Sequence, residues 1–458
     1  MTVRIDNLVV PLAHKATAMR ITDTDCSSSE RSGAVSVPIG ESLRHGDVDS
    51  TNQRSTRPTP TTPGISPSTT ATRTTTTRTT SSVPVPSADH PGRPHADFSF
   101  EELVQAYFDC RQNKRNTASA LAFEQQLERN LHDLNDDLCA GTYLPGKSIC
   151  FVITRPKPRE VWAADFRDRI VHHLLYNKIS PRFYAGFIAD SCACIPGRGT
   201  LYAAERLEAK VRSITQNWSK PAYYLKMDLA NFFVSIDKGI LHDLIARKVT
   251  EPWWLWLADL ILFHDPRQDY ELRGNAELLA RVPAHKKLTN HPGTHGLPIG
   301  NLSSQLFANI LLNELDQYCK HKLLARHYIR YVDDFVILHE SAKWLNGARE
   351  YIEAWLPTHL NLQVNTRKTI LHPIDRGIDF VGQVIKPWRR STRIRTVNEA
   401  IGKVRSTPAD DLLSVGNSYL GLIGQATAHH HDRGLIAHAL MQRGRSVTRN
   451  FSKSFHHH

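Results

Sequence analysis

The sequence predicts an α+β fold in which a small antiparallel sheet presents carboxylates at one end and helices surround it. Three observations support this prediction. Residues 330–338 place strand-forming side chains on both sides of Asp333-Asp334, which is typical of a β-hairpin with the acid pair at its tip. Residues 224–228 form a second apolar run, and it also ends on a carboxylate, Asp228. Several other segments from residue 98 onward space their apolar residues as amphipathic helices do.

The adjacent carboxylates point to a metal. Two neighbouring carboxylates repel each other, and a divalent cation bound by oxygen ligands removes that cost. Two strands that present Asp228 and Asp333-Asp334 side by side could share two metal ions, an arrangement used for phosphoryl transfer. For the pair taken alone, a surface turn that happens to hold two aspartates is the simpler interpretation.

These motifs resemble those of the reverse transcriptases, in particular the bacterial branch of group II intron and diversity-generating retroelement enzymes. The resemblance runs from about Phe151 to Ile385, with the motifs in the family's order. It implies a right-hand polymerase with fingers, a palm of antiparallel sheet plus helices, and a basic helical thumb. We expect a disordered tail over 1–97, fingers over 98–221, a palm with inserted fingers elements over 222–387, and a thumb with a C-terminal tail over 388–458.

Composition sets the class of partner. The chain has 458 residues, a formal net charge of +12 and a pI near 9.4. This excess of Lys and Arg fits a polyanion, although solubility alone is an alternative. Seven cysteines, an odd number, predict no disulfide framework, and Cys192-Ala193-Cys194 favours buried packing over a zinc site. No run approaches the roughly 18 apolar residues needed to span a membrane, and no leader pattern is evident, so we expect a cytoplasmic protein with no membrane partner.

Two segments lack a core-forming pattern. Residues 51–92 are mostly Thr, Ser, Pro and Arg, and such a composition predicts disorder. Its arginines could help to hold RNA, although a solvated tail is favoured, and the true start codon could lie downstream. Residues 265–295 are polar and without periodicity, which leaves a functional loop and a disordered one both open.

The resemblance assigns catalytic roles to a few residues. Asp228, Asp333 and Asp334 would hold two Mg²⁺ ions, Mn²⁺ being an alternative, with the backbone carbonyl of Leu229 as a further ligand. Lys368 would protonate or neutralise the leaving pyrophosphate, or else be a solvated lysine.

Other residues would bind the nucleotide. Phe233 would exclude a 2′-hydroxyl, or else be a core aromatic. Lys157 and Arg159, which prolines separate, would contact the triphosphate, a solvated basic loop being the alternative. Gly300 would lie against the new base pair.

The position before Gly300 departs from the family. Ile299 stands where most relatives carry Gln, and Gln305 follows in the next helix. This pattern resembles diversity-generating and defence-associated enzymes, and it predicts reduced copying fidelity. Template contacts are expected from Arg169 and from the turn Gly197-Arg198-Gly199.

The implied function is an RNA-directed DNA polymerase that adds dNTPs to a DNA or RNA primer on an RNA template. The resemblance also leaves room for a small basic accessory protein or a non-coding RNA as partner. Two alternatives stay open. One is a defence-associated polymerase with DNA-templated or untemplated synthesis. The other is a catalytically silent RNA-binding scaffold, which the acid triad disfavours.

Overall fold

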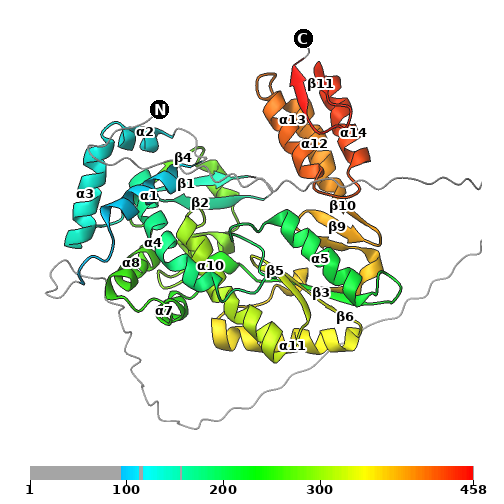
Figure 1. Ribbon diagram of the computed structural model, residues 1–458, viewed down its shortest axis with the longest axis horizontal. Coiled ribbons are helices and arrows are strands. Elements are labelled where there is room, and N and C mark those ends of the chain that lie inside the picture. Colours follow the sequence, from blue (N-terminus) through cyan, green and yellow to red (C-terminus); the bar gives the residue numbers. More distant parts are fainter. Residues whose placement is uncertain (1–93, 113–116, 155–156, 457–458) are drawn as a thin grey trace, which may run out of the picture. The chain divides into compact units, whose positions relative to one another are not determined.

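The computed structural model describes residues 94–112, 117–154 and 157–456, all within one compact unit, Ala88–His458 (Figure 1). We expected a disordered tail over 1–97, and residues 1–93 of it lie outside the described residues. Asp97, which the sequence analysis assigned to that tail, accepts a hydrogen bond from Trp254 Nε1 at 2.9 Å. Phe98 stacks on Trp253 with ring centroids 4.9 Å apart. The folded contacts therefore begin just before helix α1. No described helix combines the length and apolar character that crossing a membrane requires.

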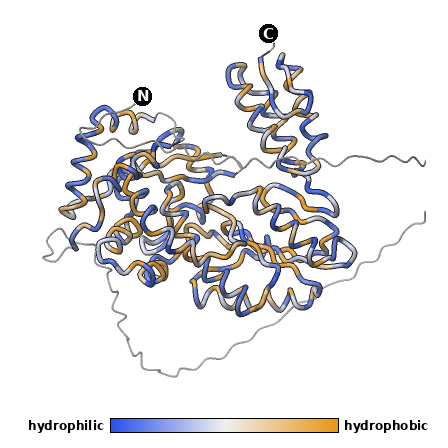
Figure 2. The backbone as a smooth tube through the Cα atoms, in the orientation of Figure 1, coloured by the Kyte–Doolittle hydropathy of each residue, from blue (hydrophilic) through white to orange (hydrophobic). Residues whose placement is uncertain are grey.

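A four-stranded antiparallel sheet carries the predicted acids. Its strand order is β5-β6-β3-β7. Hydrophobic stretches run through the region of this sheet (Figure 2). The strands are β3 (Tyr223–Asp228), β5 (His327–Tyr331), β6 (Asp334–His339) and β7 (Ile370–Pro373). The predicted hairpin is confirmed, with β5 and β6 joined by a two-residue turn, and so is the α+β class.

Alternation along these strands separates two cores. Leu225 and Phe335 are buried in the core that includes helix α11 (Ala342–Leu360). Tyr224 and Val336 are buried in a second core, together with helix α5 (Thr200–Ile214). On β3, Asp228 lies an even number of residues from Tyr224, and on β6, Asp334 lies an even number of residues from Val336. Because strand side chains alternate between faces, the acids lie on the α5 side of the sheet.

A second sheet lies upstream and includes part of the polar segment 265–295. Its order is β2-β1-β4, in which β1 (Ser148–Ile153) pairs antiparallel with β2 (Arg159–Ala163) and parallel with β4 (Tyr270–Arg273). The segment continues as α9 (Glu277–Ala280) and two 3₁₀ turns, η1 (Ala284–Lys286) and η2 (Leu288–Asn290). It is therefore regular structure built onto β1, which the lack of periodicity did not predict.

The helices largely follow the apolar spacing of the sequence. The N-terminal helical region consists of α1 (Phe100–Arg111), α2 (Ala118–Glu124) and α3 (Leu127–Ala140). Helix α4 (Phe166–Tyr184) follows β2, and α10 (Leu302–Gln317) precedes β5 and is extended by a π-helical turn, η3 (Tyr318–Lys322). The predicted burial of the two cysteines in Cys192-Ala193-Cys194 is correct for Cys192. It is wrong for Cys194, which is exposed because the chain turns there with a φ of 55°.

The chain after Asp237 forms two helices separated by a short connection. They are α7 (Lys238–Ala246) and α8 (Pro252–Phe263). Pro252 lacks a backbone N–H and cannot continue a helix, but it suits the first turn of a new one. Trp253 and Trp254 are buried and belong to the main core.

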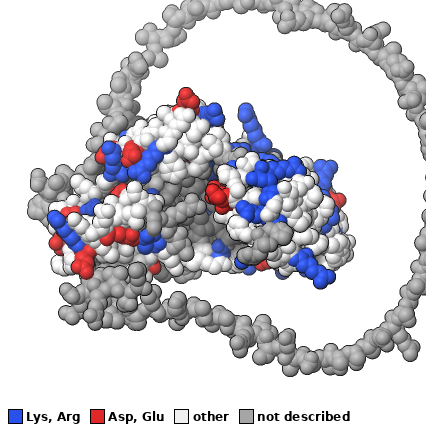
Figure 3. Space-filling view, turned by 90° about the horizontal axis from the view of Figure 1, so that it is seen from above, with Lys and Arg blue, Asp and Glu red and all other residues white. Residues whose placement is uncertain are grey.

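The C-terminal part has a core of its own, with Leu420 and Ile436 among its buried members. A small sheet of β8 (Ile378–Phe380), β9 (Gln383–Lys386) and β10 (Arg389–Thr392) precedes α12 (Ile394–Ser406), α13 (Leu412–Ile423) and α14 (His430–Met441). A final hairpin pairs β11 (Arg445–Val447) with β12 (Ser454–His456). Figure 3 shows Lys and Arg side chains gathered on the face seen from above.

Candidate active site

The three aspartates meet where β3 ends and β6 begins. Asp228, the last residue of β3, is the direct cross-strand partner of Asp334, the first residue of β6. Asp333 occupies the turn, and its backbone oxygen accepts a hydrogen bond from the N–H of Leu229 at 3.3 Å. The structure therefore brings together four residues that the sequence analysis selected for metal binding.

A buried ion pair fixes the turn that carries Asp333. Val332, directly before it, has a φ of 55°, which is unfavourable for a β-branched residue and needs support from its surroundings. Arg330 Nη1 donates to the Val332 carbonyl at 3.0 Å, and its Nη2 donates to Asp316 Oδ2 at 2.7 Å. Both charged side chains are buried, at 1% and 0% exposure. The sequence analysis missed Arg330 and Asp316, because nothing local marks two residues on different elements as partners.

The acids are electrostatically unfavourable as they stand. Burial, followed by the negative charge of Asp228, raises the pKa of Asp333 to about 6. Burial also raises the pKa of Asp334, although the ammonium of Lys226 opposes that rise. Asp334 Oδ1 is buried and accepts no hydrogen bond from any described group. An orphaned carboxylate oxygen beside two further carboxylates is a donor set that suits a hard divalent cation.

Two lysines neutralise the carboxylates. Lys368 Nζ lies 2.7 Å from both carboxylate oxygens of Asp228. Lys226 Nζ lies 3.0 Å from Asp334 Oδ2 and donates to the Asp379 carbonyl at 2.8 Å. In the described part of the chain, no three His, Cys, Asp or Glu side chains are grouped closely enough to hold a metal ion. Lys368, whose side chain is 50% exposed, is the more accessible of the two lysines, since the Lys226 side chain is 15% exposed.

Phe233 follows β3 on the short helix α6 (Phe232–Ser235). Its side chain is half-buried and packs against the main core, with its ring 5.2 Å from that of Phe232. Its backbone oxygen accepts a hydrogen bond from the N–H of Leu297 at 2.8 Å, which ties α6 to the approach to α10. Both the sugar-selection and the core interpretation agree with this position, so its role stays a prediction.

The nucleotide-binding candidates lie around β2. Lys157 and Arg159 are exposed at the start of that strand. The carbonyl of Ile299 accepts a hydrogen bond from the N–H of Trp162 at 2.7 Å. Gly300 has a φ of 133°, and a Cβ there would lie 2.9 Å from Val161 Cγ1, so the close approach to β2 requires glycine.

Gln305 and the predicted template residues have mixed surroundings. Gln305 is exposed on α10. Arg169 Nε donates to the Ala164 carbonyl at 2.8 Å. Arg198 Nη1 donates to the carbonyls of Ile188 and Ser191, both at 2.7 Å, so much of its hydrogen-bonding capacity serves the loop itself. Gly197 has a φ of 74°, whereas Gly199 is extended and precedes α5. Their contact with template stays a prediction.

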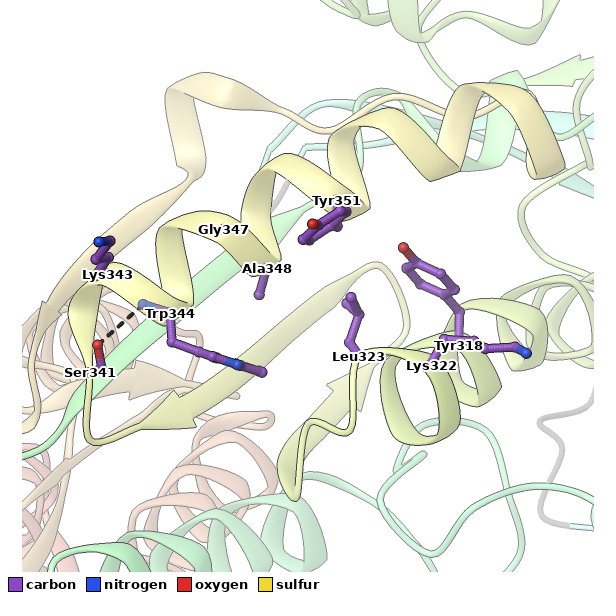
Figure 4. A pocket seen from close by; sticks show the side chains of 9 residues that line it. All are labelled: Tyr318, Lys322, Leu323, Ser341, Lys343, Trp344, Gly347, Ala348 and Tyr351. Carbon is purple, nitrogen blue, oxygen red and sulfur yellow. Dashed lines mark hydrogen bonds between the residues drawn. The ribbon is translucent and has the colours of Figure 1, made fainter.

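A cavity of about 720 Å³ lies away from these residues, between η3 and α11 (Figure 4). None of the predicted site residues lines it. Its walls combine aromatic, aliphatic and lysine side chains, namely Tyr318, Lys322, Leu323, Ser341, Lys343, Trp344, Gly347, Ala348 and Tyr351. The candidate active site is thus defined by carboxylates and cations at the strand ends, not by this cavity.

Comparisons with known proteins agree with the geometry. Residues 155–385 match the family described as reverse transcriptase (RNA-dependent DNA polymerase). Protein YkfC of Escherichia coli (strain K12) is 23% identical over 322 residues, which cover 62% of this chain and 77% of that protein. A telomerase from Candida albicans, solved with a fragment of telomeric RNA, shares 12% identity at a TM-score of 0.41 and covers 65% of this chain. An apo telomerase from Candida tropicalis shares 14% identity at a TM-score of 0.39 and covers 54% of this chain. The chain spans 55% of the length of each telomerase chain.

The family match gives the conclusion. The matched stretch makes up half of the chain and contains Asp228, Asp333 and Asp334. The chain therefore belongs to the reverse transcriptase (RNA-dependent DNA polymerase) family.

Proposed function

We propose that this protein is an RNA-directed DNA polymerase that adds dNTPs to a primer 3′ end by two-metal phosphoryl transfer. The observation that carries the proposal is the direct pairing of Asp228 with Asp334, next to Asp333, in the stretch that matches the family. Bound divalent cations, Mg²⁺ in the first instance, would supply activation of the attacking hydroxyl and neutralisation of the phosphates. The three carboxylates and the Leu229 carbonyl are the groups proposed to hold them.

The surrounding residues would position the substrates. Lys157 and Arg159 would bind the triphosphate. Lys368 would leave Asp228 and neutralise the pyrophosphate, which its exposed side chain allows. Phe233 would limit the space at the sugar. An RNA template and a primer would bind to exposed Lys and Arg side chains. An accessory protein or a non-coding RNA would be a further partner.

The test is primer extension on a defined RNA template with Mg²⁺ and dNTPs, together with RNA binding measured separately. We expect Asp228→Asn and Asp333→Asn to abolish incorporation and to leave RNA affinity within about twofold. Near wild-type extension by either variant would refute the metal assignment. Extension of the same primer on DNA only, or without any template, would favour the DNA-templated or untemplated alternative. Wild-type protein that binds RNA and extends nothing would favour the scaffold.

We further propose that the enzyme serves a retroelement such as a diversity-generating one and copies with reduced fidelity. Ile299 supports this proposal, because an apolar side chain cannot hydrogen-bond where most relatives carry Gln. Discrimination then depends on shape, and a methylene-sized difference in fit is worth only about 1–3 kcal/mol. Its carbonyl is bound by Trp162 through the backbone, so Ile299→Gln keeps that contact. Sequenced cDNA from this variant should contain fewer errors, in particular opposite template adenine. A wild-type error rate already equal to that of Gln-bearing relatives would contradict the proposal.

A further inference from the structure

The segment 265–295 is fastened beside the strand that carries the triphosphate-binding candidates. Glu160, the residue after Arg159, accepts a hydrogen bond from the backbone N–H of Leu288. Arg267 Nη1 donates to the Leu288 carbonyl at 3.0 Å. The Leu288 side chain is only 4% exposed and is buried with Trp162 of β2. The backbone two residues after Lys286 is therefore fixed against β2.

The same segment is also held against the turn that follows β3. Leu288 clusters with Val234 of α6, and a Cβ on Gly296 would lie 2.6 Å from Leu288 Cδ1. Gly296 has a φ of 86°, so the chain passes here in a conformation that glycine favours. The 3₁₀ turn η1, which ends at Lys286, is thus fixed between β2 and α6.

These anchors place Lys286 within electrostatic range of cations already assigned to the candidate site. Lys286 is an exposed residue at the end of η1. Partial burial lowers the pKa of its ammonium, and the positive charges of Lys157, Lys368 and Arg159 lower it further. The carboxylate of Asp228 opposes this effect. Lys286 therefore lies within electrostatic range of three other cations and of Asp228, and a polyanion placed among these like charges would relieve their repulsion.

We propose that Lys286 is a triphosphate-binding residue, supplied by segment 265–295, that acts together with Lys157 and Arg159 on the incoming dNTP. The inference rests on the proposed polymerase function and deepens it. A dNTP carries a chain of phosphate oxygens that can accept from several ammonium and guanidinium groups at once. A nucleic-acid backbone presents isolated phosphates instead, so the electrostatic grouping of Lys286 with Lys157 and Arg159 favours the triphosphate. The polar segment thereby gains a role in substrate binding.

The test compares Lys286→Ala with Lys286→Arg, which keeps the charge, and with Arg281→Ala. Arg281 is an exposed cation on the same segment that is not among the charges acting on Lys286, so its variant controls for the loss of one positive charge. Two measurements are made on a defined RNA template. One is the steady-state kcat and KM for dGTP. The other is the Kd of dGTP in Mg²⁺ for enzyme bound to a primer that ends in a dideoxynucleotide, which needs no turnover.

We expect Lys286→Ala to raise both KM and Kd about tenfold, with kcat changed by less than about twofold. Loss of an interaction made equally in the ground and transition states has this signature. Lys286→Arg should recover most of the affinity, and Arg281→Ala should stay within about twofold of wild type.

The inference can fail separately from the proposed function. If Lys286→Ala extends the primer as well as wild type does, with unchanged KM and Kd, the role of Lys286 is overturned and the proposed polymerase function still holds. A fall in kcat with unchanged KM and Kd would also overturn it, because the affinity for the triphosphate would then not depend on Lys286. Wild-type enzyme that neither extends a primer nor binds dGTP would overturn both.

Discussion

Single residues at the candidate site show how the chain tolerates three neighbouring carboxylates. Lys226 lies two residues before Asp228 on β3, so both side chains project from the same face. Its ammonium reaches Asp334 on the adjacent strand, while Lys368 covers Asp228. The protein thus supplies its own positive charges where the proposed cations would bind. Strand alternation could have indicated Lys226 from the sequence, since it shares the face of Asp228.

Phe233 gives a prediction at this scale. Replacing it with Val removes ring atoms from a half-buried position in α6, the short helix that follows β3. If the ring blocks a 2′-hydroxyl, rNTP incorporation should rise at least tenfold, with a smaller change for dNTPs. Each tenfold change corresponds to about 1.4 kcal/mol in the barrier. The measurement is the ratio of kcat/KM values for dGTP and GTP on one RNA template.

Phe232→Val is the matched control, because Phe232 is the buried neighbour in the same helix. This variant should lower stability and leave the sugar preference unchanged. An unaltered ratio of the kcat/KM values for dGTP and GTP in Phe233→Val would show that Phe233 is a core residue without a role in sugar selection.

At the scale of elements, one ion pair joins α10 to β5. Asp316 of α10 accepts from Arg330 and also from the Tyr328 hydroxyl at 2.7 Å. Removing one partner of a buried pair leaves an uncompensated charge, which typically costs about 3–5 kcal/mol. We therefore expect Arg330→Met to lower the free energy of unfolding by about that amount, measured with urea. Combining it with Asp316→Asn should recover part of the loss, because Asn is uncharged and still accepts from Tyr328. A single variant as stable as wild type would contradict the structural role of the pair.

A buried histidine between α4 and α10 makes stability depend on pH. His172 shares a hydrogen bond of 2.7 Å with the Ser303 hydroxyl, and burial lowers its pKa to about 3. The unfolded chain, with a pKa near 6.5, therefore binds more protons than the folded one between about pH 6.5 and 3. Stability contributed by neutral His172 is present above that window and is lost as the pH falls through it.

The variant His172→Asn, which cannot titrate and can still bond Ser303, tests this dependence. Relative to its value at pH 7.5, the unfolding free energy of wild type should fall by about 2 kcal/mol more than that of the variant at pH 5. Urea titrations at the two pH values measure the difference. Parallel pH dependence of the two proteins would show that His172 does not titrate as its burial indicates.

At the scale of the whole molecule, the contacts at the start of the folded unit define a truncation. Asp97 and Phe98 bind Trp254 and Trp253, and the family match begins later, at residue 155. Deleting residues 1–93 should therefore leave primer extension unchanged within about twofold and leave the unfolding midpoint unchanged. Deleting residues 1–98 should lower the midpoint, because both contacts are lost. A folded 94–458 protein without activity would show that the tail contributes to function.

The sequence by itself determined the acid motif, because the evidence for it is local. Apolar runs that end on Asp228 and flank Asp333-Asp334 predict strands that present carboxylates at their ends, and the structure confirms those strands. The α+β right-hand polymerase class follows from the same residues and is confirmed by the family match and the fold. The boundaries of fingers, palm and thumb stay predictions.

Only the tertiary structure decided which distant side chains surround the acids. Lys368 meets Asp228 across 140 residues of sequence. Arg330 and Asp316 meet in a buried pair. The polar segment 265–295 places Lys286 within electrostatic range of Asp228. A local pattern fixes the face on which a side chain lies, but contacts between elements depend on how strands and helices pack. The charge balance at the site is therefore a property of the fold, since Coulomb interactions depend on distance in space and burial, not on separation along the chain.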